Sequence, residues 1–154
     1  MTTLKIGDKA PQFEAKDENG KIISLKDYAG KKKILYFYPK DNTPGCTANA
    51  CDFRDNFELL QGKGYEIIGV SSQGEKSHQK FIAKFDLPFP LITDEDLKVH
   101  HQYEVWGLKK FMGREYDGTH RTTFVIDEND VIIQIIQKVK TKAATEQILA
   151  LMEE

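Results

Sequence analysis

The stretch "KILYFYPKDNTPGC", residues 33–46, contains the change of pattern that decides the fold. Its first part, "KILYFYP", is a continuous apolar run rich in aromatic residues, which is typical of a β-strand buried on both faces. From Thr43 onward the apolar residues recur at helical spacing, up to the glycines at positions 62 and 64: Ala50, Phe53, Phe57 and Leu60. The stretch therefore predicts a buried strand that leads into a helix through a short loop.

Similar patterns predict elements on both sides of this unit. Residues 12–25, "QFEAKDENGKIISL", indicate a β-hairpin, because the dipeptide Asn19-Gly20 suits a tight turn. Residues 65–72, "YEIIGVSS", form a second buried strand, and Ser72 with Glu75 gives the capping-box pattern that starts a helix. A short strand in "LPFPLITD" and a short helix in "EDLKVHHQYEV" are expected next.

The C-terminal part predicts an antiparallel strand pair and a closing helix. The runs "RTTFVID" and "VIIQIIQKV" are separated by turn residues, and the last segment has one apolar helix face: Ala144, Ile148, Leu151 and Met152. This order of elements is that of an α/β layer fold with a mixed sheet. No repeat or linker interrupts residues 1–154, so we expect a single domain.

Composition excludes several classes of function. A chain of 154 residues is long enough to bury a core without disulfides or metal ions. The net charge is −2, and basic residues are matched by acidic ones along the chain, so we expect no nucleic-acid binding. The N-terminus has no secretory pattern and no apolar run approaches membrane-spanning length, so we expect a cytoplasmic protein that does not bind membranes.

Cys46 falls in the first turn of the predicted helix. Thr43 is a favourable N-cap residue, and Pro44 occupies the first helical position, where a missing N–H costs nothing. The unpaired backbone N–H groups and the positive end of the helix dipole stabilise a thiolate over a thiol. We therefore interpret Cys46 as a reactive cysteine rather than an inert one.

Cys51 is the second of the two cysteines, five residues later. On an ideal helix five residues advance about 7.5 Å and turn through about 140°, so the two Cα atoms stand roughly 8 to 9 Å apart. A disulfide requires less than about 7 Å. The pair can therefore bond only if the first turns unwind, and Cys51 alone is also explained as a small apolar side chain.

Arg121 opens the apolar run "TTFVI". A guanidinium is costly to bury without an anionic partner, so a solvated strand end is the commoner explanation. If its strand lies beside "ILYFY", however, Arg121 can reach Cys46 and hold its thiolate.

Three other features have plain structural interpretations. His100 and His101 are adjacent and cannot share a helix face, so we interpret them as surface residues. The run "KKK" at 31–33 is interpreted as a solvated turn before a strand. Trp106 and its aromatic neighbours fit a core or a pocket wall better than a stacking platform for nucleic acid.

The segment "FYPKDNTPGCTANACDFRD" resembles the active-site segment of the peroxiredoxins, in which Pro39, Thr43 and Cys46 follow the order P-x-x-x-T-x-x-C. Cys51, five residues after Cys46, is similar to the arrangement in the peroxiredoxin Q subfamily, also called bacterioferritin comigratory protein. The likeness extends to "GDKAPQFEAKDENGK", "SHQKFIAKFDLPFPLITD" and "VWGLKKFMGREYDGTHRTTFVID". It therefore covers nearly the whole chain.

The resemblance implies a thioredoxin-like fold, with a central mixed sheet flanked by helices, and a thiol peroxidase without cofactor or metal. It implies that Cys46 is the peroxidatic cysteine, and that Thr43 hydrogen-bonds the peroxide. Pro39 would shield the thiolate from water and Arg121 would bind thiolate and peroxide. Cys51 would be the resolving cysteine of an intramolecular disulfide that thioredoxin or a similar dithiol reduces.

One position departs from the family pattern. Three residues after the peroxidatic cysteine many members carry Glu, whereas this chain has Asn49, which brings no charge to orient the arginine. The chemistry still agrees with the assignment, because a thiolate that attacks a peroxide needs donors for the charge that develops along the O–O bond. The resulting sulfenic acid condenses with a nearby thiol before further oxidation.

The prediction is therefore a peroxidase for hydrogen peroxide and organic hydroperoxides, monomeric because the resolving thiol is internal. A second hypothesis is a redox sensor or interaction module that uses the same disulfide. A third is a Cys2His2 zinc site with Cys46 and Cys51, although the usual short ligand spacings are missing.

Overall fold

The computed structural model describes residues 1–153, and its centre is a five-stranded sheet in the order β5-β4-β3-β8-β9. The strands are β3 (Lys32–Phe37), β4 (Tyr65–Ser71), β5 (Leu91–Thr93), β8 (Thr122–Ile126) and β9 (Ile132–Ile136). β4 pairs in parallel with β3 and β5, whereas β8 is antiparallel to both β3 and β9. The predicted mixed-sheet α/β fold is confirmed.

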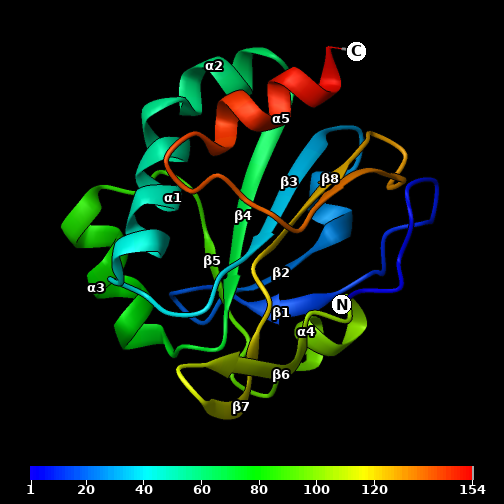
Figure 1. Ribbon diagram of the computed structural model, residues 1–154. Coiled ribbons are helices and arrows are strands. Elements are labelled where there is room, and N and C mark those ends of the chain that lie inside the picture. The colour runs from blue at the N-terminus through cyan, green and yellow to red at the C-terminus, as the bar shows by residue number, and fades with distance from the viewer. Residues whose placement is uncertain (154) are drawn as a thin grey trace.

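Helices cover both faces of this sheet (Figure 1). They are α1 (Pro44–Asp55), α2 (Phe57–Gly62), α3 (Glu75–Phe85), α4 (Lys98–Gln102) and α5 (Ala144–Met152). Residues of α1, α2, α3 and α5 form one apolar core with Ile34 and Tyr36 of β3. The opposite face packs Leu35 and Phe37 of the same strand against α4 and the N-terminal segment. β3 is thus buried on both faces, as its continuous apolar run predicts.

Two small hairpins lie outside the main sheet. The predicted N-terminal hairpin is present as β1 (Glu14–Lys16) and β2 (Ile22–Ser24), joined by a loop that the Asp17 carboxylate holds through the N–H groups of Asn19 and Lys21. A second hairpin, β6 (Trp106–Phe111) and β7 (Arg114–Thr119), was not predicted. Its strands lack regular apolar alternation, so the period-2 signal is absent.

Two predictions about helix ends are wrong. The helix expected to run from Thr43 to Gly62 is interrupted at Asn56, whose backbone leaves the helical region (φ −109°, ψ 13°) and whose side-chain amide adds a bond to Asp52 O beside the backbone one. The helix expected to be capped by Ser72 begins later, at Glu75, because the chain is still extended at Gly74. No side-chain cap is made there.

Two residues interpreted as surface residues are buried. Lys33 belongs to β3, is completely buried and forms an ion pair with Asp130. His100 is also completely buried, between the Asp94 carboxylate and the Thr119 hydroxyl. His101 is exposed as expected, and the half-buried ring of Trp106 packs edge-on against His100, in keeping with a wall position. The burial of Lys33 and His100 depends on partners elsewhere in the chain, Asp130 and Thr119, which a local sequence pattern does not contain.

Candidate active site

The start of α1 places Cys46 in the first helical turn, as predicted. Thr43 is the N-cap residue, its backbone is extended, and Pro44 follows it in the first turn. The Thr43 side chain does not cap the helix, however, because Thr43 Oγ1 donates to Lys40 O at 2.8 Å. Cys46 is only 2% exposed, so its sulfur lies under the surface close to the N–H groups of the helix end.

Arg121 reaches this sulfur from the neighbouring strand. Residues of β8 pair antiparallel with β3, so Arg121, just before β8, lies at the end of β3 from which the chain enters α1. Its Nη2 donates to Cys46 Sγ at 2.9 Å. A Cβ atom added to Gly45 would lie 3.5 Å from the same nitrogen, an ordinary van der Waals contact, so the guanidinium packs beside the residue that precedes the cysteine. The predicted contact between Arg121 and Cys46 is therefore present.

This arrangement favours chemistry by an anionic sulfur. A guanidinium carries a permanent positive charge, and together with the helix end it stabilises negative charge on the adjacent sulfur. Tyr36 lies on the same side of the sheet and is fully buried. Burial, followed by the negative charges of Cys46 and Asp41, raises the pKa of Tyr36 well above its ordinary value. The phenol therefore stays protonated near the sulfur.

A buried polar network holds the loop between β3 and α1. The Asp41 carboxylate accepts hydrogen bonds from Tyr38 Oη at 2.6 Å and Ser77 Oγ at 2.7 Å, and it contacts His78 Nδ1 at 2.6 Å. Ser77 and His78 belong to α3, so this network ties the loop that carries Pro39 and Thr43 to a second helix. The sequence analysis missed it, and the only available signal was an acidic residue two positions after the apolar run "KILYFYP".

Several polar atoms in this region have no hydrogen-bond partner within residues 1–153. They are Tyr36 Oη, Arg121 Nη1 and both polar atoms of the Asn49 side chain. Asn49 is completely buried and stands one helical turn after Cys46. Where a carboxylate would offer two acceptors to the arginine, Asn49 makes no contact with it that qualifies as a hydrogen bond.

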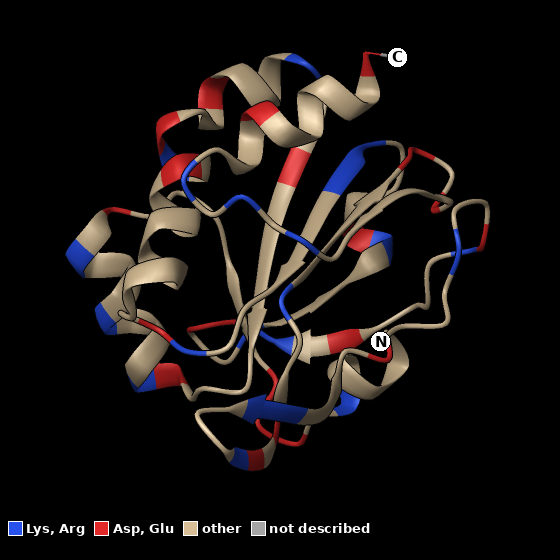
Figure 2. Ribbon diagram, viewed as in Figure 1, with Lys and Arg blue, Asp and Glu red and all other residues tan. Residues whose placement is uncertain are grey.

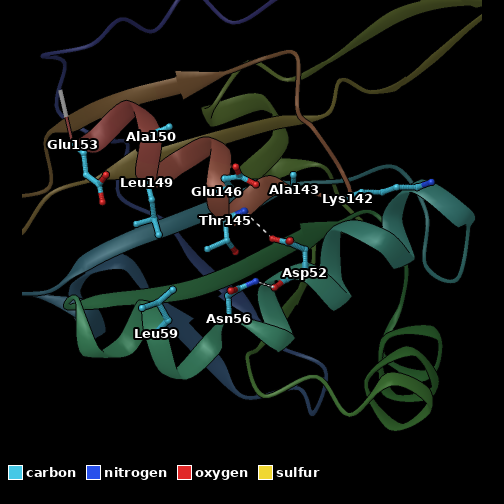
Figure 3. Close-up of a pocket in the computed structure, with 10 residues that line it drawn as sticks. All are labelled: Asp52, Asn56, Leu59, Lys142, Ala143, Thr145, Glu146, Leu149, Ala150 and Glu153. Atoms are coloured by element: carbon cyan, nitrogen blue, oxygen red, sulfur yellow. Dashed lines mark hydrogen bonds between the residues drawn. The ribbon is translucent and has the colours of Figure 1, made fainter.

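Cys51 is half-buried on α1, and both cysteines are free thiols in an unbroken helix. The neighbouring Asp52 connects α1 to α5: its Oδ2 accepts from Thr145 N at 2.7 Å (Figure 3). The cavity drawn in Figure 3, of about 420 Å³, lies between these helices and does not include either cysteine in its lining. No group of three or more His, Cys, Asp or Glu side chains in residues 1–153 is placed to hold a metal ion.

A cysteine held by an arginine at a helix start, on a thioredoxin-like sheet, defines the class of thiol peroxidases. Comparisons with known proteins agree. The AhpC/TSA family matches residues 6–135. The chain is 48% identical over 140 residues to peroxiredoxin Bcp of Bacillus subtilis, an alignment that covers 91% of this chain and 89% of that one.

Solved structures give the same result. A PrxQ mutant of Xylella fastidiosa superposes with a TM-score of 0.91 at 28% identity, covering 99% of this chain and 98% of that one. The bacterioferritin comigratory protein of Xanthomonas campestris, studied for alkyl peroxide reduction, superposes with a TM-score of 0.85 at 30% identity, covering 99% of this chain and 98% of that one. The chain therefore belongs to the AhpC/TSA family, and it is a peroxiredoxin, a thiol-dependent peroxidase.

No helix within residues 1–153 has the length and apolar character needed to cross a membrane.

Proposed function

We propose that Cys46 is the sulfur that reduces hydroperoxides in this enzyme. The observation that carries the proposal is the 2.9 Å hydrogen bond from Arg121 Nη2 to Cys46 Sγ at the start of α1. In the reaction the Cys46 thiolate attacks the terminal oxygen of the hydroperoxide. An S–O bond forms, the O–O bond breaks, and the leaving alkoxide or hydroxide takes up a proton. Cys46 becomes a sulfenic acid.

The groups around Cys46 have distinct roles in this step. Arg121 would balance the negative charge that moves from the sulfur to the leaving oxygen, because its positive charge is already fixed in place. Thr43 Oγ1 donates its hydrogen to Lys40 O, so its lone pairs are free to accept the hydrogen of the peroxide hydroxyl. The half-buried ring of Pro39, which has no N–H, would keep water from the reacting sulfur.

Cys51 would then resolve the sulfenic acid. Its sulfur attacks Cys46 Sγ, a disulfide forms, and hydroxide leaves as water. Because both cysteines lie in the continuous helix α1, this step requires the helix to open between them. The Asp52–Thr145 bond to α5 marks where the opening would stop, since Asp52 directly follows Cys51. Far-UV circular dichroism and amide exchange test this, and equal protection of residues 46–52 in reduced and oxidised protein would refute it.

The cycle would close by exchange with a dithiol protein such as thioredoxin, which leaves both cysteines reduced. An internal resolving thiol needs no second subunit, so we propose a monomer that acts as one domain over residues 1–154 in the cytoplasm. Steady-state turnover with thioredoxin separates the enzyme from a peroxide sensor, which would react once per molecule.

The decisive experiment compares two matched cysteine variants. Cys46→Ser should consume no peroxide above background, whereas Cys51→Ser should react once and then stall or over-oxidise. Mass spectrometry of the wild type after one equivalent of peroxide should find the loss of two hydrogens and a linked 46–51 peptide. Full turnover by Cys46→Ser would overturn the assignment.

A further inference from the structure

A second cavity, of about 340 Å³, borders the candidate active site. It is lined by residues of β6, of the segment that enters β8 and of the segment that follows β9: Met1, Lys109, His120, Arg121, Thr122, Gln137 and Lys138. We call it the basic pocket. Arg121 belongs both to this pocket and to the Cys46 site, so a ligand here would lie within one side chain of the sulfur.

The basic pocket concentrates positive charge without an acidic counterpart. Lys109, Arg121 and Lys138 line it together with His120, and none of its lining residues is acidic. This is not a consequence of a basic chain, because the net charge is −2. Figure 2 shows basic segments on β6 and on the stretch after β9, on a molecule whose charges are otherwise mixed.

Lys109 and Lys138 have no carboxylate partner within residues 1–153, and Arg121 donates to the Cys46 sulfur rather than to a carboxylate. Among residues 1–153, ion pairs occupy Lys31, Lys33, Arg54 and Lys110, whereas no salt bridge involves Lys109, Arg121 or Lys138. Most of the 22 basic residues of the chain likewise form no ion pair with a carboxylate within residues 1–153, and the completely buried Lys33 is one of the four that do. What distinguishes the pocket is that three basic side chains line one cavity that no acidic side chain lines.

The pKa of Lys109 reflects burial and the positive charge of the neighbouring Arg121. Burial, and then the charge of Arg121, lowers the pKa of Lys109, while Cys46 acts in the opposite direction. Lys109 Nζ uses one hydrogen for Thr119 O at 3.0 Å, which leaves two donors for another acceptor. Two cations held near each other are stabilised by any anion that enters between them.

We propose that the basic pocket binds an oxyanion, a carboxylate or a phosphate, through Lys109 and Lys138 beside Arg121. Lysine ammonium groups act as point charges and accept either group without a strict geometry. The oxyanion comes from one of two sources: a free ion, or an anionic group carried by the hydroperoxide itself. The second source rests on the proposed function of Cys46, because the peroxide must then reach this sulfur.

The first experiment measures binding without any peroxide, so its outcome does not depend on the proposed function. Reduced wild type is titrated with inorganic phosphate at constant ionic strength, and amide chemical shifts are followed by NMR. In the double variant K109Q/K138Q the phosphate affinity should fall about fivefold or more. A fivefold change corresponds to about the upper end of what one exposed charge pair contributes to binding. The matched control is Lys110→Gln, the exposed neighbour on β6 that pairs with Glu115, which should bind as the wild type does.

The second experiment distinguishes the two sources of the oxyanion. Reduction of a hydroperoxide that carries a carboxylate is compared with reduction of its methyl ester. If the substrate carries the anion, kcat/KM of the wild type should favour the acid, and K109Q/K138Q should lose this preference. If the anion is free, phosphate should change the rate with hydrogen peroxide in the wild type, and K109Q/K138Q should remove this effect.

The proposal is overturned if K109Q/K138Q and the wild type bind phosphate equally and also show the same acid-to-ester ratio. Thermal unfolding of each variant confirms that it is folded. If the double variant does not fold, the exposed single change Lys138→Gln gives the same two readouts with a smaller shift. If no variant reduces peroxide at all, the proposed function fails while the phosphate result still stands.

Discussion

Two buried polar clusters in this fold are built in opposite ways. In the histidine cluster, Asp94 accepts from the backbone N–H groups of Val99 and His100, and the His100 ring lies between Asp94 at 2.6 Å and Thr119 at 2.9 Å. In the cysteine cluster, formed by Tyr36, Cys46, Asn49 and Arg121, a single hydrogen bond joins the arginine to the sulfur. The remaining buried polar atoms there have no partner within residues 1–153.

We interpret the hydrogen-bonded histidine cluster as supporting the fold and the cysteine cluster as the place of the reaction. A buried polar group without a partner costs about 1 to 3 kcal/mol, so we expect the cysteine cluster to contribute less to stability than the hydrogen-bonded histidine cluster. Unsatisfied buried groups in a native protein call for an explanation such as catalysis or stored strain. Here they belong to Asn49 within α1, to Arg121 beside Cys46 and to Tyr36 of β3, and α1 is the helix that we propose opens for Cys51 to reach Cys46. The predictions below test this contrast, beginning with the largest effect.

The histidine cluster should dominate stability. Asp94→Ala leaves the completely buried His100 without its charged partner, and we expect a loss of about 3 to 5 kcal/mol in the free energy of unfolding. Urea denaturation followed by circular dichroism measures it. The matched control is His101→Ala, an exposed neighbour that should change stability by less than about 0.5 kcal/mol. A loss below about 1 kcal/mol for Asp94→Ala would show that the cluster is not structural.

The cysteine cluster should dominate rate. Arg121→Gln removes the donor to Cys46 Sγ, and we expect the rate constant of the first oxidation to fall about 10² to 10³-fold. The free energy of unfolding should change little, because the unpartnered Nη1 is removed together with that bond. Rapid-mixing kinetics with hydrogen peroxide measure the rate, and Arg114→Gln, an exposed arginine on β7, serves as the control. A rate within about threefold of the wild type would contradict the role of Arg121.

Asn49 should affect both the stability of the protein and the rate at which the disulfide forms. Asn49→Leu replaces a buried amide without partners by an apolar side chain of similar size, and we expect stability to stay equal or rise by about 1 kcal/mol. A firmer α1 should then form the Cys46–Cys51 disulfide more slowly and leave more over-oxidised Cys46. The matched control is Asn56→Leu, which loses a bond to Asp52 O and should destabilise. Mass spectrometry after several equivalents of peroxide measures both products. Equal over-oxidation in Asn49→Leu and the wild type would remove Asn49 from this step.

The sequence predicts the cysteine cluster far better than the histidine cluster. Thr43, Pro44 and Cys46 are adjacent, so a local capping pattern places the sulfur at a helix start. The position of Arg121 near Cys46 follows from one further inference, the antiparallel pairing of the two apolar runs that form β3 and β8. The role of Cys46 and of its neighbours is carried by the resemblance to the family rather than by these patterns.

The histidine cluster escapes prediction because the burial of His100 depends on Thr119, 19 residues later, and on the folding of Asp94, six residues earlier, against the same ring. His100 is buried only because Asp94 and Thr119, from either side of it in the chain, supply its partners. Lys33 is a similar case, since its partner Asp130 is 97 residues away. The unpartnered state of Asn49 is equally invisible in the sequence, where an asparagine on a helix indicates exposure. Local period and capping therefore predict where the Cys46 sulfur lies, but not which of the polar groups around it are buried or paired.

Lowering the pH should reduce the free energy of unfolding through the histidine cluster and not through the cysteine cluster. This effect should be the smallest of those predicted. Burial raises the pKa of Asp94, but the hydrogen bonds from His100 and from the backbone of Val99 outweigh it and leave this pKa below the ordinary value of 3.8. A carboxylate whose folded pKa is lowered contributes stability above the unfolded value, and this stability is lost as the pH falls through the folded value. The cysteine cluster carries Asn49 where a carboxylate would titrate, so it adds nothing to this loss.

We therefore expect the free energy of unfolding of the wild type to decrease as the pH is lowered from about 5 to 3, and Asp94→Asn to show a shallower decrease. Thr119→Val is the matched control: it removes a hydrogen bond to His100 but keeps those to Asp94, so it should be less stable at every pH with the slope of the wild type. Urea denaturation at four values of pH measures all three proteins. If Asp94→Asn keeps the full slope, the acid sensitivity arises outside the histidine cluster, and the contrast between the two clusters concerns rate alone.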